Sequence, residues 1–242
     1  MNTLLNENTG SSPFFVWFRR AFWVDDRPRP EPGKVRVFLD RHLWLFLILA
    51  TLIGFGCGVA AEFLIFQWNS HPPVSFGLFL MPPVLLGWLT LRPGKGALVG
   101  LVTLLVVMLG HFVGAQFTEY DQNNLEYRGW TFIAIFMGLL LGFLGHKIRS
   151  PRMITRALAT STPATLLCIP LYFWYEDVHY FSDYFDPRMA VFDVTFVLLL
   201  LFLCRGGIAR IAALLFAPAL FYPLGLSLVI TSPLLWYSGG GI

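Results

Sequence analysis

Three ionisable side chains lie within long apolar stretches of the sequence, where water is scarce. Glu62 is in "GCGVAAEFLIFQW", His111 in "LVVMLGHFVGAQF" and Asp193 in "MAVFDVTFVLLLL". A carboxylate alone in hydrocarbon costs at least about 2.5–3.5 kcal/mol, so each carboxylate needs a partner or water. A protonated His111 between the two carboxylates predicts a charge-paired cluster with coupled titration. A neutral His111 predicts a cation site, with Glu62 and His111 as metal-ligand candidates and Gln116, one turn above, as a neutral ligand.

These three residues are predicted to share one depth in a membrane. Glu62 lies six residues before Trp68 and His111 six before Phe117, near the outer ends of two predicted spans. Asp193 lies five residues after the arginine that precedes its span. At about 1.5 Å per helical residue, each would lie roughly 8–9 Å below the outer boundary. Separate structural roles are the alternative: an over-long span around Glu62, a helix start near Asp193 and a carbonyl partner for His111.

The composition is typical of integral membrane proteins. Hydrophobic residues make up 56% of the 242 residues and charged residues only 13%, about half the charged share of a soluble domain. The three cysteines fall inside apolar runs without CxxC or CxH spacing, so neither a disulfide framework nor a zinc site is predicted. The net charge of +3 is small, and we expect no nucleic-acid partner.

Apolar runs predict an all-α fold, a polytopic transmembrane helix bundle of about seven spans. Six spans with a re-entrant or interfacial C-terminal piece are the alternative, because Pro218, Pro223 and Gly225 interrupt the last run. The predicted parts are a cytoplasmic N-terminal arm (1–42), the bundle (43–237) and a short tail (238–242). The predicted spans are 43–68, 73–91, 96–117, 130–146, 157–175, 189–204 and 211–236.

Lysine and arginine residues predict that the N-terminus is cytoplasmic. Positive charge stays on the cytoplasmic side in short loops, and about 15 of the 17 basic residues agree with one orientation. Only Arg128 and Arg188 fall on the other side. We therefore expect a protein of the cell (inner) membrane that is surrounded by lipid and, with seven spans, has an outer C-terminus.

Prolines and glycines predict where the helices bend and pack. Pro82 and Pro83 lie in the middle of the second span, where each removes a backbone donor, so a helix break or gate is predicted there. Glycine pairs at GxxxG spacing predict close packing against helices of this chain or of other membrane subunits. The pairs are Gly54/Gly58, Gly96/Gly100, Gly110/Gly114 and Gly138/Gly142.

Two aromatic segments are predicted to dock partner subunits. The first, "SSPFFVWFRRAFWV", precedes a proline-rich linker and is typical of a segment in the lipid headgroup layer, so interfacial anchoring is the alternative. The second, "YFWYEDVHYFSDYF", combines an acidic outer loop with residues favoured at protein interfaces. The candidate docking residues are Trp17, Arg19, Arg20, Trp23, Tyr175, Asp177 and His179.

One hairpin, "LMPPVLLGWLTLRPGKGALVGLVTLL", resembles the second and third helices of the small substrate-binding subunits of vitamin transporters. It covers about a tenth of the chain. The same pattern recurs in many unrelated membrane proteins, so no family is assigned from it.

Two functions from different classes are predicted. The first is a small permease-type transporter, or transporter subunit, with an outward-facing polar site for a cation or small solute at Glu62, His111 and Asp193. The alternative is a non-catalytic membrane subunit or assembly factor of a larger complex. The sequence contains no HExxH, GxSxG, phosphate-loop or Rossmann motif, so it predicts no catalytic residue and identifies no cofactor.

Overall fold

The computed structural model describes residues 32–67, 77–117, 124–176 and 187–220, and the regular structure in these ranges is all helical. Only the backbone is described at the helix ends 65–67, 124–129, 169–176 and 187–190. The predicted all-α fold is confirmed for these residues. The helices are α2 (Lys34–Arg41), α3 (Leu43–Gln67), α4 (Gly77–Leu89), α5 (Pro93–Ala115), α6 (Asn124–Lys147), α7 (Met153–Glu176), α8 (Pro187–Leu203) and a final helix, Gly207–Leu220.

Each predicted span overlaps a helix. Among the described residues, three segments are long and apolar enough to cross a membrane: Leu43–Leu64 in α3, Pro93–Ala115 in α5 and Trp130–Lys147 in α6. Shorter apolar helices are Gly77–Leu89, Val191–Leu203 and Gly207–Leu220. These helices indicate a membrane protein whose apolar side chains contact the bilayer.

Three local features differ from the sequence-based expectations. Residues Lys34–Arg41, assigned to the N-terminal arm and its linker, form the helix α2, which buries Leu39 and Asp40. Helix α6 begins at Asn124, so it includes the end of a predicted outer loop. Helix α4 continues from Gly77 to Leu89 through both internal prolines, so the predicted break is absent.

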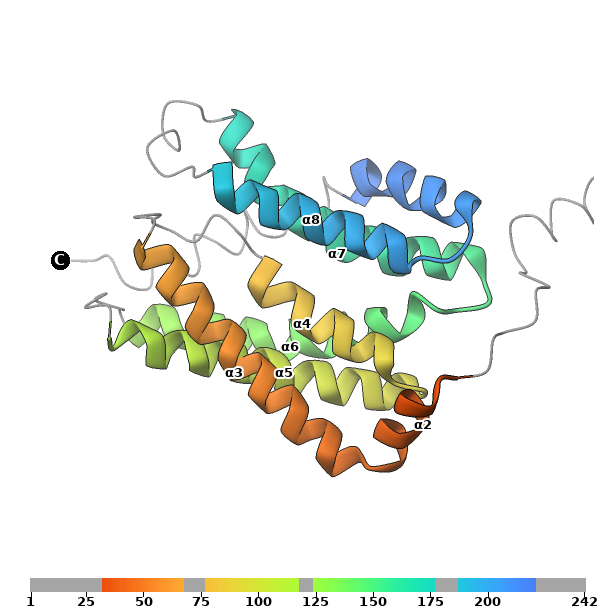
Figure 1. Cartoon of the computed structure of the whole chain (residues 1–242). Helices are drawn as coiled ribbons and strands as arrows, with labels where there is room; N and C mark the ends of the chain where they lie inside the picture. The colour runs from red at the N-terminus through yellow and green to blue at the C-terminus, as the bar shows by residue number, and fades with distance from the viewer. Residues whose placement is uncertain (1–31, 68–76, 118–123, 177–186, 221–242) are drawn as a thin grey trace, which may run out of the picture.

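The two prolines are tolerated because α4 is enclosed by other helices. Pro82 and Pro83 are buried, and α4 contacts each of α3, α5, α6, α7 and α8. A proline removes one helical hydrogen bond and crowds the preceding turn, but packing on several sides can hold such a helix together. Figure 1 shows α4 lying between the group formed by α3, α5 and α6 and the pair α7 and α8.

The glycine pairs join α3, α5 and α6 into one layer. A Cβ atom added to Gly54 would lie 2.7 Å from the Thr103 carbonyl oxygen of α5, and one added to Gly110 would lie 2.4 Å from the Phe55 carbonyl oxygen of α3. A Cβ atom added to Gly100 would lie 2.4 Å from the carbonyl oxygen of Gly138 on α6. All four GxxxG pairs therefore face helices of this chain, and the prediction that they meet other subunits is not supported.

The bundle has two ends that differ in chemistry. Helix α2 and the turns at 90–92, 148–152 and 204–206 lie together on the right of Figure 1. We call this the α2 end. The opposite end includes the last turns of α3 and α5 and the first turns of α4 and α8, and we call it the Glu62 end.

Candidate functional site

Glu62 of α3 and His111 of α5 form a buried pair near the Glu62 end. His111 Nδ1 lies 2.9 Å from Glu62 Oε2, and the two side chains are 14% and 2% exposed, respectively. Burial disfavours an isolated charge on either group. The pair therefore favours two arrangements, a carboxylate facing an imidazolium or a neutral carboxyl facing a neutral imidazole, which differ by the position of one proton.

Glycines bring the two helices close enough for this pair to form. A Cβ atom added to Gly58 would lie 2.0 Å from the Val107 carbonyl oxygen and 2.7 Å from the His111 backbone nitrogen. A Cβ atom added to Gly114 would lie 2.9 Å from Glu62 Cβ. These positions require glycine, because larger side chains would separate the helices. The GxxxG faces of α3 and α5 thus set the register that places Glu62 opposite His111.

Asp193 of α8 is held at the start of α4. Its Oδ1 atom accepts a hydrogen bond of 3.0 Å from the backbone N–H of Gly77, the first residue of α4, and the residue is 1% exposed. The first N–H groups of a helix lack intrahelical acceptors, and a negative charge there also interacts favourably with the helix dipole. Asp193 therefore has a clear capping role.

The first turn of α4 contacts both polar groups. Phe79 and His111 rings meet nearly at right angles, with 5.4 Å between their centroids, while Gly77 bonds to Asp193. Positions two residues apart point to opposite sides of a helix. The Glu62–His111 pair and Asp193 thus contact the same helical turn on different sides.

The remaining predicted site residues are distributed as follows. Gln116 is exposed just beyond the end of α5. Among the described residues, no group of three or more His, Cys, Asp or Glu side chains could hold a metal ion. Tyr175 lies in the last turn of α7, where only the backbone is described. The docking candidates Trp17, Arg19, Arg20, Trp23, Asp177 and His179 lie outside the described residues.

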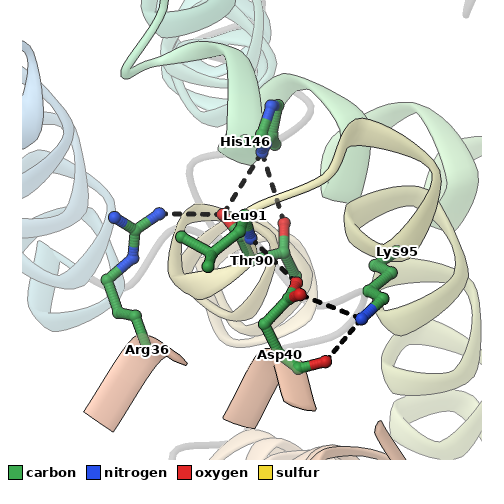
Figure 2. Close-up of polar contacts among 6 residues, drawn as sticks. All are labelled: Arg36, Asp40, Thr90, Leu91, Lys95 and His146. Atoms are coloured by element: carbon green, nitrogen blue, oxygen red, sulfur yellow. Dashed lines mark hydrogen bonds and ion pairs between the residues drawn. The ribbon is translucent and has the colours of Figure 1, made fainter. Parts of the chain in front are cut away.

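A second polar cluster, which the sequence analysis did not identify, lies at the α2 end (Figure 2). Lys95 of α5 forms an ion pair of 2.9 Å with Asp40 of α2, and it also bonds to the Asp40 carbonyl oxygen. Asp40 Oδ1 accepts a 3.2 Å hydrogen bond from the backbone N–H of Leu91. These contacts fix α2 against the turn between α4 and α5.

Arg36 of α2 closes the C-terminal end of α4. Its guanidinium donates to the carbonyl oxygens of Trp88 (3.2 Å), Leu89 (3.1 Å) and Thr90 (2.8 Å). The last carbonyl groups of a helix lack intrahelical donors, so a cation there stabilises the helix end. On the other side of this turn, His146 Nδ1 of α6 lies 3.3 Å from the Thr90 carbonyl oxygen, as Figure 2 shows.

The pKa values of two groups at the α2 end, Asp40 and Arg36, are both lowered, for different reasons. Burial would raise the Asp40 carboxyl pKa, but hydrogen bonds from Lys95 and Leu91 and the charges of Lys95 and Arg92 lower it below its usual value. Burial, with repulsion from Arg149 and Arg205, lowers the pKa of Arg36 to about 10, although Asp40 opposes this change. The α2 end therefore holds more positive charge than its described acidic residue can balance.

Comparison with known proteins assigns the chain to a family. The model of a family described as "Family of unknown function (DUF6518)" matches residues 38–232, which is most of the 242-residue chain. The chain belongs to this family. No curated protein and no solved structure matches the chain.

The DUF6518 match includes most of both polar clusters. Glu62, His111 and Asp193 lie inside it, as do Asp40 and Lys95, whereas Arg36 and the aromatic arm precede it. A sequence signal for the second cluster existed, because Asp40 is the only acidic residue between Lys34 and Glu62. An isolated acid among basic residues at the start of a span indicates a local ion pair.

Proposed function

We propose that this DUF6518 protein is a multi-pass integral membrane protein of the permease type, with the Glu62–His111 pair as its proton- or cation-binding site. The observation that supports the proposal best is the 2.9 Å contact between these two side chains in the buried interface of α3 and α5. Ionisable groups inside a membrane bundle are expensive to bury and mark ion or proton pathways in many membrane proteins.

The membrane arrangement proposed for this function has seven spans, or six with a re-entrant last segment, and a cytoplasmic N-terminus. Its support is the coincidence of helices with the predicted spans and the gathering of basic turns at the α2 end. Positive charge is retained on the cytoplasmic side. The Glu62 end then faces outward, so solutes would reach the pair from the outer side.

The chemistry of the pair suits a small cation. With His111 neutral and Glu62 ionised, the pair carries one negative charge that a proton or metal cation can neutralise. With His111 protonated, the pair is already neutral and a bound cation must leave. Binding of a cation and protonation of His111 are therefore mutually exclusive, which is the requirement for proton-coupled exchange.

The first turn of α4 can supply further ligands to this site. Pro82 and Pro83 have no N–H groups, so the carbonyl oxygens of Leu78 and Phe79 lack their usual helical donors. Phe79 already contacts His111 through its ring. Carbonyl oxygens without helical donors line ion sites in transporters. In the proposed site, the carbonyl oxygens of α4 act as ligands without a break in the helix.

The test is proton-coupled flux in proteoliposomes that contain the purified full chain. A pH-sensitive dye inside the vesicles reports proton movement when Na⁺ or K⁺ is added outside. We expect Glu62→Gln to lower the initial rate at least about 10-fold, because the amide neither gains nor loses a proton and carries no negative charge. His111 can lose its own proton in this variant, so no buried charge is stranded and the fold should persist.

Asp193→Asn is the matched control, because it makes the same chemical change in another buried carboxylate near the same end. The asparagine oxygen can still accept the Gly77 hydrogen bond, so we expect most of the flux to remain. Equal flux in wild type and Glu62→Gln would overturn the proposal. If flux is absent from wild type, and native mass spectrometry finds the chain bound stoichiometrically to other subunits, the non-catalytic subunit function replaces it.

A further inference from the structure

Three arginines from separate segments converge at the α2 end, away from the Glu62–His111 pair. Arg36 comes from α2, Arg149 from the turn after α6 and Arg205 from the turn after α8. The Arg149 guanidinium lies 4.9 Å and the Arg36 guanidinium 5.8 Å from the centroid of the Trp88 ring. One indole ring therefore contacts two cations. We call Arg36, Arg149 and Arg205 the arginine cluster.

The described residues do not neutralise this cluster. Asp40, the acidic side chain that attracts Arg36, already pairs with Lys95. In the described ranges, the Arg149 and Arg205 guanidinium groups have no hydrogen bond and no carboxylate within 4.0 Å. Arg36 donates through Nε and Nη2, which leaves Nη1 available. Several guanidinium N–H donors are therefore directed at no described acceptor.

The mutual repulsion of these arginines would favour binding of an anion. Burial and the charge of Arg205 lower the pKa of Arg149, and Arg149 and Arg205 both contribute to the lowered pKa of Arg36. A bound anion would oppose this repulsion, because its negative charge attracts each guanidinium. Phosphate suits the cluster because guanidinium groups bind its oxygens through paired hydrogen bonds.

The depth of the cluster favours a lipid phosphate. The apolar span of α5 begins at Pro93, and that of α6 ends at Lys147. Arg149 therefore lies just beyond the apolar layer, where headgroups are found. Next to Arg205 in the chain, Phe202 is 74% and Ile208 50% exposed. Such side chains can contact acyl chains while the arginines contact the headgroup.

We propose that the arginine cluster, with Trp88, is a binding site for the phosphate group of an anionic membrane lipid. The site is separate from the Glu62–His111 pair, so it does not depend on the transport proposal. Its role would be to hold α2, the turn after α6 and the turn after α8 together at the membrane surface.

The test measures the thermal stabilisation of the purified full chain in neutral detergent as short-chain phosphatidylglycerol is added. Arg149→Gln/Arg205→Gln is expected to raise the concentration for half-maximal stabilisation about 10-fold or more, since two phosphate-facing charges are lost. Arg152→Gln is the matched control, because Arg152 is exposed in the same turn as Arg149 and should change this concentration less than twofold. Arg205→Gln alone, at an exposed position, provides a partial effect if the double variant does not fold.

Each other outcome contradicts the proposal in a specific way. An equal loss in Arg152→Gln would indicate a general basic surface, and equal stabilisation by phosphatidylcholine would exclude recognition of anionic charge. Stabilisation by inorganic phosphate at the same concentration would identify a soluble anion as the ligand. If wild type does not respond but the variant Asp25→Asn/Asp26→Asn/Glu31→Gln does, the chain's own acidic segment occupies the cluster instead.

Discussion

Glu62 and His111 are close enough to compensate for each other's charge in the apolar interior. Their separation is 2.9 Å, and this arrangement has modest value for stability alone. Desolvating two charges offsets most of their attraction, so apolar residues of similar volume often stabilise a bundle as well. The modest stabilisation expected from such a pair is the reason for proposing a binding role at this place.

Sequence reasoning grouped Glu62 with His111, and the two side chains do meet, but their depth in a membrane stays a prediction. Counting residues to the ends of the spans gives an expected height of a side chain in the membrane. It does not give the direction in which a side chain points around its helix. Asp193 was assigned to the same cluster, yet its described bond is to the Gly77 N–H. A joint site of all three residues is untested, and it would require Asp193→Asn to lose flux as Glu62→Gln does.

Asp40 gives a prediction for acid conditions. Its carboxyl pKa lies below the usual value, so the folded state binds fewer protons than the unfolded state near that pKa. The stabilising contribution is therefore complete at neutral pH and is lost as pH falls below about 4. We expect Asp40→Asn to lower the free energy of unfolding by about 1–3 kcal/mol at pH 7.

The measurement for Asp40 is thermal unfolding in detergent between neutral and acid pH. The difference between wild type and Asp40→Asn should shrink as the pH falls through the carboxyl pKa, because the wild-type carboxylate is then protonated as well. A difference that stays constant over this range would show that the ion pair with Lys95 does not stabilise the fold.

At the scale of elements, the close contact between α3 and α5 places the two residues of the candidate site opposite each other. A Cβ atom on Gly58 would lie 2.0 Å from a backbone carbonyl of α5, whereas one on Gly56 meets nothing within 4 Å. Gly58→Ala must therefore separate the two helices and should lower the free energy of unfolding by more than about 2 kcal/mol. Gly56→Ala should be neutral or stabilising by up to about 1 kcal/mol, because alanine favours helix.

Unfolding of the two glycine variants in the same detergent checks this prediction. If Gly58→Ala and Gly56→Ala have equal stability, α3 and α5 are not in close contact at Gly58. The close contacts themselves were predictable from GxxxG spacing, but the partner helices were not. The spacing shows that one face of a helix is lined by small residues. Which helix packs against that face depends on the arrangement of the whole bundle.

Helix α4 shows where local rules were insufficient. Two adjacent prolines predict a break, but α4 is continuous from Gly77 to Leu89. Its contacts with α3, α5, α6, α7 and α8 and the Asp193 and Arg36 groups at its two ends hold it in place. A single sequence window contains none of these long-range interactions.

At the scale of the whole molecule, the polar groups gather at two ends. The α2 end gathers arginines and the Asp40–Lys95 pair, while the Glu62 end holds the buried pair. Hydropathy predicted where the apolar helices lie, because it depends on local composition alone, and the seven spans and their orientation stay predictions. The helix α2 was missed because its stability comes from contacts with residues about 50 positions away.

The central claim is that Glu62 titrates and is reached from the side opposite α2. The most direct measurement is isotope-edited infrared spectroscopy of the carboxyl groups in oriented proteoliposomes, with the pH changed on one side at a time. The account predicts a carboxyl band that responds to pH on the side opposite α2 and is absent in Glu62→Gln. A Glu62 band that stays constant on both sides, or that responds only from the α2 side, would contradict it.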